Sequence, residues 1–222
     1  NETQRAFIDL LKDSGMSRDD IIELNYGDVK KAVEDETVKF FKVRVYRKKE
    51  DVEYETWIGP NAIESLRVYF EYRRRRGETI TDTTPIFASH LTPYERINKE
   101  TLSAILRRLS ERTGITISTH RLRKFFETYI VGGGVHPITA KYWMGHKITT
   151  SRDVESRYII PPENLQREQY EKAYSHIDVE GSMSIQELQE RQRLAEDLQD
   201  KILRGIALSA EELALAKRYN IR

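Results

Sequence analysis

The sequence predicts a mainly helical domain with one small antiparallel β-hairpin, an α+β fold. Apolar residues recur at helical spacing through most of the 222 residues, while the stretch 38–58 alternates apolar and polar side chains as paired strands do. A hydrophobic fraction of 38% and a charged fraction of 33% are typical of a globular protein with a buried core.

The chain is expected to begin with two short helices, over 5–13 and 18–26. Ser17 and Asp20 have the Ser-x-x-acid form of a capping box, in which each side chain accepts a hydrogen bond from the other residue's backbone. A helix start at Arg18 follows from this pattern.

The hairpin over 38–58 has its turn at residues 48–51. Its outgoing strand has one apolar face and one polar face, because successive side chains of a strand point to opposite sides. The apolar face consists of Phe41, Val43 and Val45, and the polar face of Lys42, Arg44 and Tyr46. The return strand continues the pattern with Val52, Tyr54, Thr56 and Ile58.

Five more helices are expected before residue 160. Pro60 opens the first, because proline is favoured in the first turn of a helix. Residues 77–93 are mostly loop. The helices cover 60–75, about 102–109, 119–131, 137–144 and 153–158.

The tail from about residue 163 is also helical, and two more capping boxes lie in it, Ser184 with Glu187 and Ser209 with Glu212. Two interpretations of its weak apolar stripe remain open. The tail helices either pack on their own domain or are exchanged with a neighbouring protomer.

Composition excludes several classes of protein. With no cysteines, the chain has neither a disulfide framework nor a thiolate metal site, which fits an intracellular protein. No apolar run is long enough to span a bilayer, and the start lacks a signal-peptide pattern. We therefore expect no membrane association and a cytoplasmic location.

The net charge of +1 conceals an uneven distribution of charge. Basic residues concentrate in the hairpin, at 73–76 and over 107–124, while acidic residues are in excess toward the tail. A basic face with an acidic flank suits binding to a phosphate backbone. For the run 73–76 alone, a solvated helix face is an equally good interpretation.

Four chemically capable side chains follow one another between residues 119 and 158: His120, Arg123, His146 and Tyr158. An arginine binds a pair of phosphate oxygens, a histidine donates hydrogen bonds or moves protons, and a tyrosine can be a covalent nucleophile. Taken singly, each has a plain alternative as a surface or packing residue, and Tyr158 is one of 12 tyrosines. As a set, they suit phosphoryl transfer.

The pattern resembles the catalytic core of the tyrosine recombinases, the site-specific integrases, over residues 5–175. That family reads His-x-Leu-Arg, then Leu-Gly-His, then Tyr. This chain reads His120 to Arg123, then Gly145-His146, then Tyr158. The text around Tyr158 is similar to archaeal and archaeal-virus integrases, so the resemblance implies a recombinase of a mobile element, virus or plasmid.

The resemblance also implies roles. Tyr158 would attack a DNA phosphodiester to give a 3′-phosphotyrosyl link, and arginines including Arg123 would hold the non-bridging oxygens. His146 would hydrogen-bond a phosphate oxygen, and His120 would help to accept the tyrosine proton. Lys49 of the hairpin turn, with Lys48 as the near alternative, would protonate the departing 5′ hydroxyl. Neither a metal nor another cofactor is implied.

The first arginine of the family pattern is where the resemblance falters. Relatives carry Thr-Gly-Leu-Arg, whereas here Ser17 holds the arginine position counted from Gly15, and Arg18 lies one residue later. One residue at a helix start rotates a side chain by about 100°. Arg18 is the favoured candidate, because serine cannot neutralise the charge of a phosphorane; the alternative is that this arginine is missing.

The implied partners are double-stranded DNA attachment sites and other protomers, as a dimer or tetramer on DNA. A catalytic domain over 1–175 and a helical tail over 176–222 are expected, without the family's N-terminal core-binding domain. The expected DNA-binding residues are Arg44, Arg47, Lys48, Arg121, Lys124 and Lys147.

Three other functions were weighed on the same residues. A type IB topoisomerase shares the chemistry but relaxes DNA without exchanging strands. A catalytically impaired DNA-binding relative would follow from Ser17 replacing arginine. A replication initiator or relaxase is disfavoured, because it requires a His-x-His metal pair that the sequence lacks.

Overall fold

The computed structural model describes residues 2–89, 95–146, 161–178, 201 and 209. The chain divides into two compact units, Asn1–Val179 and Glu180–Arg222. The helices and strands described here all lie in the first unit. The pair Ser184–Glu187, Glu212 of the second pair and the helix expected over 153–158 lie outside the described residues.

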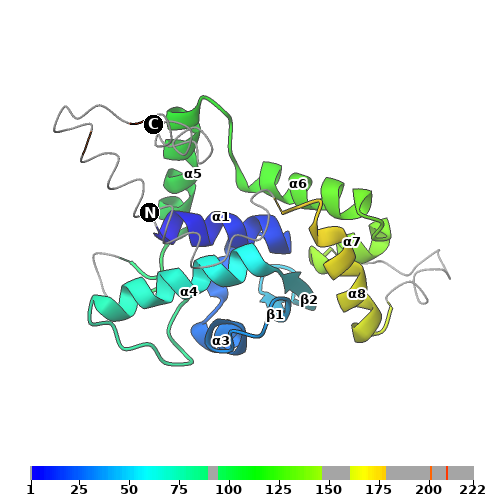
Figure 1. Cartoon of the computed structure of the whole chain (residues 1–222), viewed down its shortest axis with the longest axis horizontal. Helices are drawn as coiled ribbons and strands as arrows, with labels where there is room; N and C mark the ends of the chain where they lie inside the picture. Colours follow the sequence, from blue (N-terminus) through cyan, green and yellow to red (C-terminus); the bar gives the residue numbers. More distant parts are fainter. Residues whose placement is uncertain (1, 90–94, 147–160, 179–200, 202–208, 210–222) are drawn as a thin grey trace. The chain divides into compact units, whose positions relative to one another are not determined.

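The first unit is mainly helical and contains a two-stranded antiparallel sheet (Figure 1), so the expected fold class is confirmed. Its elements are α1 (Glu2–Ser14), α2 (Arg18–Glu23), α3 (Tyr26–Glu34), β1 (Phe41–Arg47), β2 (Val52–Ile58), α4 (Pro60–Arg75), α5 (Lys99–Thr113), α6 (Thr119–Gly132), α7 (Pro137–Trp143) and α8 (Glu163–Tyr174).

The predicted capping box at the start of α2 is confirmed. Ser17 Oγ accepts the Asp20 amide at 3.1 Å, and the Asp20 carboxylate accepts the Ser17 amide at 3.1 Å. The predicted length of this helix is wrong, because α2 ends at Glu23. Leu24 is extended, and a separate helix, α3, begins at Tyr26.

The hairpin pairs Phe41 with Ile58 at one end and Arg47 with Val52 at the other. Val43 and Val45 are buried while Arg44 and Tyr46 are exposed, so the predicted alternation of β1 is confirmed. The same alternation puts Arg47, two residues after Val45, on the inner face of the hairpin.

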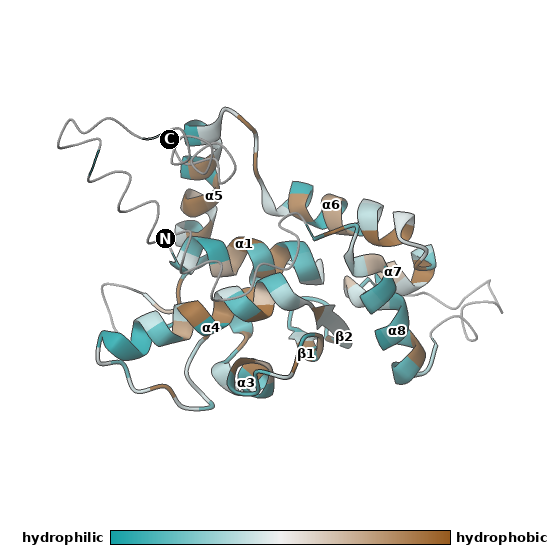
Figure 2. Ribbon diagram, in the orientation of Figure 1, coloured by the Kyte–Doolittle hydropathy of each residue, from teal (hydrophilic) through white to brown (hydrophobic). Residues whose placement is uncertain are grey.

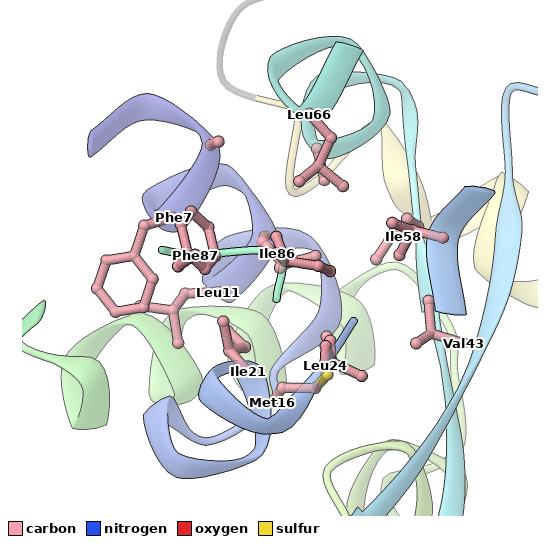
Figure 3. Close-up of a cluster of buried hydrophobic side chains, with 14 of the residues drawn as sticks. Phe7, Leu11, Met16, Ile21, Leu24, Val43, Ile58, Leu66, Ile86 and Phe87 are labelled. Carbon is pink, nitrogen blue, oxygen red and sulfur yellow. The ribbon is translucent and has the colours of Figure 1, made fainter. Parts of the chain in front are cut away.

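The main core lies between α1, α2, α4 and the hairpin. Figure 3 shows Phe7 and Leu11 of α1, Ile21 of α2, Val43 and Ile58 of the hairpin and Leu66 of α4 converging, with Met16, Leu24, Ile86 and Phe87 between them. Full burial of one such side chain stabilises the fold by about 1.5–3 kcal/mol.

A second cluster joins α6, α7 and α8 to strand β2. It consists of Trp57, Phe126, Ile130, Val135, Ala140, Trp143, Met144, Tyr170, Ala173, Tyr174 and Ile177. Figure 2 shows brown, hydrophobic segments alternating with teal, hydrophilic ones along α6, as expected of a helix that covers a core with one face. Because the motif residues lie on α6 and after α7, this cluster fixes their positions.

Buried polar contacts fasten α8 to α1. The Tyr170 hydroxyl donates to the Asp13 carbonyl at 2.7 Å, and Lys12 Nζ donates to the Ile177 carbonyl at 3.0 Å. Among the described residues, no helix has the length and apolar character needed to cross a membrane.

Candidate active site

Helix α6 carries the His-x-x-Arg motif on its first turns. Ser118 caps the helix, its Oγ accepting the Arg121 amide at 3.2 Å. His120 is exposed, whereas Arg123 is partly buried and faces the turn between α1 and α2. The motif therefore has one solvent-facing and one inward-facing member.

Gly15 allows α6 to approach that turn. Its φ of +63° is a left-handed conformation that favours glycine, and a Cβ there would lie 2.3 Å from a carbon of the Phe126 ring. The resulting close contact lets Arg123 Nη1 donate to the Gly15 carbonyl at 2.6 Å.

Residues Met144–Gly145–His146 end helix α7 and are called the histidine turn here. Gly145 has φ +71°, and the His146 amide bonds back to the Lys141 carbonyl at 3.0 Å, a closure typical of helix C-termini. The last carbonyls of a helix lack partners within it and carry partial negative charge. They therefore attract cationic donors.

Two arginines bind the carbonyls of the histidine turn. Arg123 Nη2 donates to Met144 O at 3.2 Å, and Arg47 Nη2 donates to the same oxygen at 2.9 Å. Arg47 Nη1 also donates to the Gly145 carbonyl at 2.5 Å. Two guanidinium groups from β1 and α6 thus converge on one oxygen.

The His146 ring lies within this pair of charges. Its Nε2 is 3.4 Å from Arg123 Nη2. Burial lowers the pKa of His146 below its usual value, and the charges of Arg123 and Arg47 lower it further. The ring is therefore neutral at pH 7, with one nitrogen to donate and one to accept.

Arg47 is held on its other side by Asp20 of α2. Its Nη2 lies 2.6 Å from Asp20 Oδ2, its Nε 3.1 Å from Oδ1, and its guanidinium 5.0 Å from the centre of the Tyr54 ring. Burial alone would raise the pKa of Asp20, but hydrogen bonds from Arg47, Ser17 and Tyr54 outweigh it and hold that pKa below its usual value. The buried pair is therefore ionised at neutral pH.

The charged neighbours of Arg123 act in opposite directions. Burial lowers the pKa of Arg123, and the nearby charge of Arg47 lowers it further, whereas Tyr54 and Asp20 raise it without cancelling the decrease. An anion bound between the two guanidinium groups would relieve both unfavourable terms. Arg47 is paired with Asp20 at 2.6 Å and lies 4.0 Å from Glu50, so Arg123 is the less compensated cation of the two.

The two candidates for the first arginine lie elsewhere. Ser17 is used in the capping box of α2. Arg18 Nη1 donates to Ser103 Oγ of α5 at 2.6 Å, and its Nη2 pairs with Asp19 at 2.9 Å. Neither residue has a recorded contact with Arg123 or His146.

The hairpin lysines lie in the turn, as expected. Lys48 pairs with Glu23 at 2.6 Å, and Lys49 is exposed. Of the expected DNA-binding residues, Arg44, Arg121 and Lys124 are exposed, whereas the Arg47 side chain is only 10% exposed. Lys147 and Tyr158 lie outside the described residues.

The arginine run at the end of α4 is engaged within the fold. Arg73 is buried and donates to Glu78 and to the Ile86 carbonyl, each at 2.8 Å. Arg74 donates to Tyr26 and Arg76 to Tyr72. The buried Arg73 is therefore structural, whereas Arg74, Arg75 and Arg76 are exposed.

A cleft of about 560 Å³ lies beside the hairpin, but its charge is unsuited to phosphate. Its lining has more carboxylates than cations: Asp20, Glu23, Asp28, Glu53 and Glu55 against Arg44 and Lys48. Within the described ranges, no three His, Asp or Glu side chains gather as metal ligands would.

The sequence predicted Arg47 only as a DNA-binding residue and gave no indication of its link to Asp20. The alternation of strand β1 could have indicated the inward position, because residue 47 lies on the same face as the buried Val43 and Val45. A charged residue at an inward position needs a buried partner. That partner, Asp20, is 27 residues earlier and is not apparent from local pattern.

Residues 1–159 match the model of the phage integrase family. Among solved structures, the XerA recombinase is 20% identical with a TM-score of 0.52, and the match covers 76% of this chain and 58% of the XerA chain. XerH bound to its difH substrate is 16% identical with a TM-score of 0.52, covering 74% and 44%. The integrase of mycobacterium phage Brujita is 18% identical with a TM-score of 0.54, covering 83% and 54%.

The likeness to these solved structures shows a shared fold, and this chain spans about half the length of each. No curated protein matches the chain. The family match covers well over half of the chain and agrees with the motif order from His120 to Tyr158. The chain belongs to the phage integrase family of tyrosine recombinases.

Proposed function

We propose that this chain is the catalytic part of a site-specific recombinase that cuts and rejoins DNA through a 3′-phosphotyrosyl intermediate. The observation that carries the proposal is the contact between Arg123 and His146, 23 residues apart in sequence and 3.4 Å apart in space. Their position beside a second guanidinium makes a compact cationic site on the side of the domain that bears the motif.

In the proposed reaction, the Tyr158 phenol oxygen attacks a backbone phosphorus. A P–O bond to tyrosine forms, and the bond to the 5′ oxygen of the next nucleotide breaks. His120, exposed at the start of α6, takes the phenolic proton, and Lys49 of the hairpin turn protonates the departing oxygen. Attack by a second 5′ hydroxyl reverses the step and joins the new strand.

Charge stabilisation comes from the inward-facing residues. The negative charge on the phosphate increases as the fifth bond forms, and preorganised donors stabilise that change most. Arg123 presents its guanidinium to one non-bridging oxygen, and the neutral His146 ring donates to another. Hydrogen bonds to the carbonyls of Gly15 and Met144 hold Arg123 in place, and the His146 ring lies 3.4 Å from its Nη2.

The proposed partner is double-stranded DNA. XerH, one of the similar structures, is bound to a DNA substrate. The exposed Arg44, Arg121 and Lys124 would bind the backbone, so affinity should fall steeply as salt rises. Assembly of two or four protomers on the DNA is part of the same proposal.

Covalent trapping tests the function. The probe is a pool of DNA duplexes randomised on both sides of a nick, incubated in chelator with the chain, with Tyr158→Phe and with Tyr129→Phe, which alters an exposed tyrosine. Cleavage near the nick releases a short strand and prevents rejoining. We expect an adduct with the wild type and Tyr129→Phe, none with Tyr158→Phe, and a DNA-modified peptide containing Tyr158. No adduct at any sequence would refute the function.

One observation favours a second candidate, a DNA-binding relative with impaired catalysis. Ser17 takes the place of an expected arginine and is fully used as a helix cap. This candidate predicts DNA retention on a filter without any adduct in the trapping experiment. A topoisomerase-like activity predicts an adduct but no exchange of strands between two recovered sites.

A further inference from the structure

We propose that Arg47, at the end of strand β1, supplies the second guanidinium of the phosphate site, in place of the arginine absent at position 17. The inference rests on the proposed function and assigns a catalytic role to a residue otherwise expected only to bind DNA.

The placement of Arg47 next to Arg123 is the first support. The Nη2 atoms of both residues donate to the single oxygen of Met144, at 2.9 and 3.2 Å. Two guanidinium groups this close can each reach a non-bridging oxygen of one phosphate, Arg47 through the second hydrogen of its Nη1. Neither Ser17 nor Arg18 has such a contact with the site.

The second support is the fixed orientation of Arg47. Asp20 occupies the edge formed by Nε and Nη2, and Tyr54 lies against the guanidinium plane. Nη1 points to the histidine turn, where one of its two hydrogens is donated to Gly145 O, and the half-exposed carboxylate of Glu50 lies 4.0 Å from the same nitrogen. Asp20 therefore aims the other end of the guanidinium at the place where His146 begins.

The third support is the charge that the site requires. His146 is neutral at pH 7, so without Arg47 the cation beside it would be Arg123 alone. Among the described residues, Arg47 is the other cation bonded to the histidine turn. Loss of one preorganised donor to a developing oxyanion costs on the order of 10²-fold or more in rate.

In this proposal, Arg47 binds the phosphate that an arginine at position 17 would bind, but it comes from a different element of the fold. An arginine at residue 17 would reach the site from the start of α2, on the same helix as Asp20. Arg47 reaches the site from the hairpin and is bound to that same Asp20. Helix α2 therefore contributes the carboxylate that orients Arg47.

A neutral phosphate analogue separates charge neutralisation from mere support of the fold. The DNA recovered by trapping is prepared with its cleaved phosphate either normal or replaced by methylphosphonate, which removes one negative charge. Initial rates of adduct formation are measured for the wild type, Arg47→Ala, Arg47→Lys, Arg18→Ala and Arg123→Ala. Each variant is compared with itself on the two DNAs, so partial loss of folded protein cancels.

We expect Arg47→Ala to slow the reaction by about 10²-fold or more on normal DNA and by less than about tenfold on the methylphosphonate. Arg123→Ala should show the same rescue, and Arg47→Lys should lie between Arg47→Ala and the wild type. Equal losses for Arg47→Ala on both DNAs would overturn the inference, because they would mean support of the histidine turn alone. Rescue confined to Arg18→Ala would also overturn it.

Arg47→Ala leaves Asp20 buried without its partner, which can prevent folding. The double variant Asp20→Asn with Arg47→Met removes both charges and keeps the volume. It should fold, as judged by a cooperative urea transition, and show the same rescue by methylphosphonate; equal losses on both DNAs again refute the role. If the wild type itself forms no adduct, the proposed function fails, whereas an adduct insensitive to Arg47 refutes this inference alone.

Discussion

The indole Nε1 of Trp143 donates a buried hydrogen bond of 2.8 Å to the side-chain oxygen of Gln166. Trp143 is the last residue of α7, directly before the histidine turn, and the Gln166 amide nitrogen donates in turn to the Pro161 carbonyl at 2.8 Å. One amide thus joins α7 to the start of α8, and the position of His146 depends on a helix that follows Tyr158 in sequence.

Replacement of this amide should destabilise the domain. Gln166→Leu leaves the buried indole N–H and the Pro161 carbonyl without their partner, and an unsatisfied buried group costs about 1–3 kcal/mol. The free energy of unfolding from urea titrations checks this. Glu168→Ala, an exposed change on the same helix, is the control and should stay within about 0.5 kcal/mol of the wild type.

Gly145 should tolerate alanine less well than a glycine with a similar backbone conformation. Gly145 and Gly114 have φ of +71° and +69°, but a Cβ at Gly145 would lie 2.6 Å from the Tyr54 ring, whereas one at Gly114 would have nothing within 4 Å. Gly114→Ala should cost about 1–2 kcal/mol of unfolding free energy. Gly145→Ala should cost about 1–3 kcal/mol more. Equal losses would show that the turn adjusts freely.

The stability of the domain should fall as pH rises through the titration of Asp9. Burial raises the pKa of this carboxyl to about 6, despite its hydrogen bond from Ser65. Between the unfolded pKa of 3.8 and the folded value of about 6, the native state holds a proton that the unfolded state has released. This proton stabilises the native state by roughly 3 kcal/mol, fully below pH 3.8 and not at all above pH 6.

Asp9→Asn removes that titration while keeping a side chain able to accept the Ser65 hydroxyl. Urea midpoints of both proteins at pH 4.5 and 7.5 measure the difference. Between pH 4.5 and 7.5, we expect the urea midpoint of the wild type to fall relative to that of Asp9→Asn. If both midpoints change by the same amount, the pH dependence comes from other groups.

The pKa of His146 should rise when its cationic neighbour is removed. Burial and the charge of Arg123 lower it, so Arg123→Gln should return it part of the way to its ordinary value. NMR titration of the imidazole carbons, assigned with His146→Gln, reports the pKa directly. Arg121→Gln, on the same helix but directed to the Thr116 carbonyl, is the matched control. An unchanged value in Arg123→Gln would contradict the observed contact.

Much of the local structure was predictable, because its causes are local. The Ser17–Asp20 capping box, the alternation of β1 and the helix start at Pro60 all follow from neighbours within four residues. Helix α3 had a comparable signal, the Asp28 carboxylate that accepts the Asn25 amide at 2.8 Å, but the preceding helix was extended across it.

The composition of the site was less predictable, because it depends on pairings between distant residues. Arg123 and His146 were found through their motif. Whether a charged side chain at the end of β1 lies outside or inside depends on α2 and on the turn after α7, which pack there only in the folded chain. The order of residues along the chain does not show that Arg47 and Arg123 both donate to the Met144 carbonyl.

Helix α8 has a practical consequence for anyone who produces this domain in isolation. The family match ends at residue 159, whereas the compact unit continues to Val179. A chain cut at the family boundary would lose Tyr170, Ala173, Tyr174 and Ile177, and so uncover the indoles of Trp57 and Trp143. Such a truncated protein would expose an aromatic surface close to the histidine turn and would be prone to aggregate. A fragment that keeps this cluster intact therefore extends to Val179, the end of the compact unit.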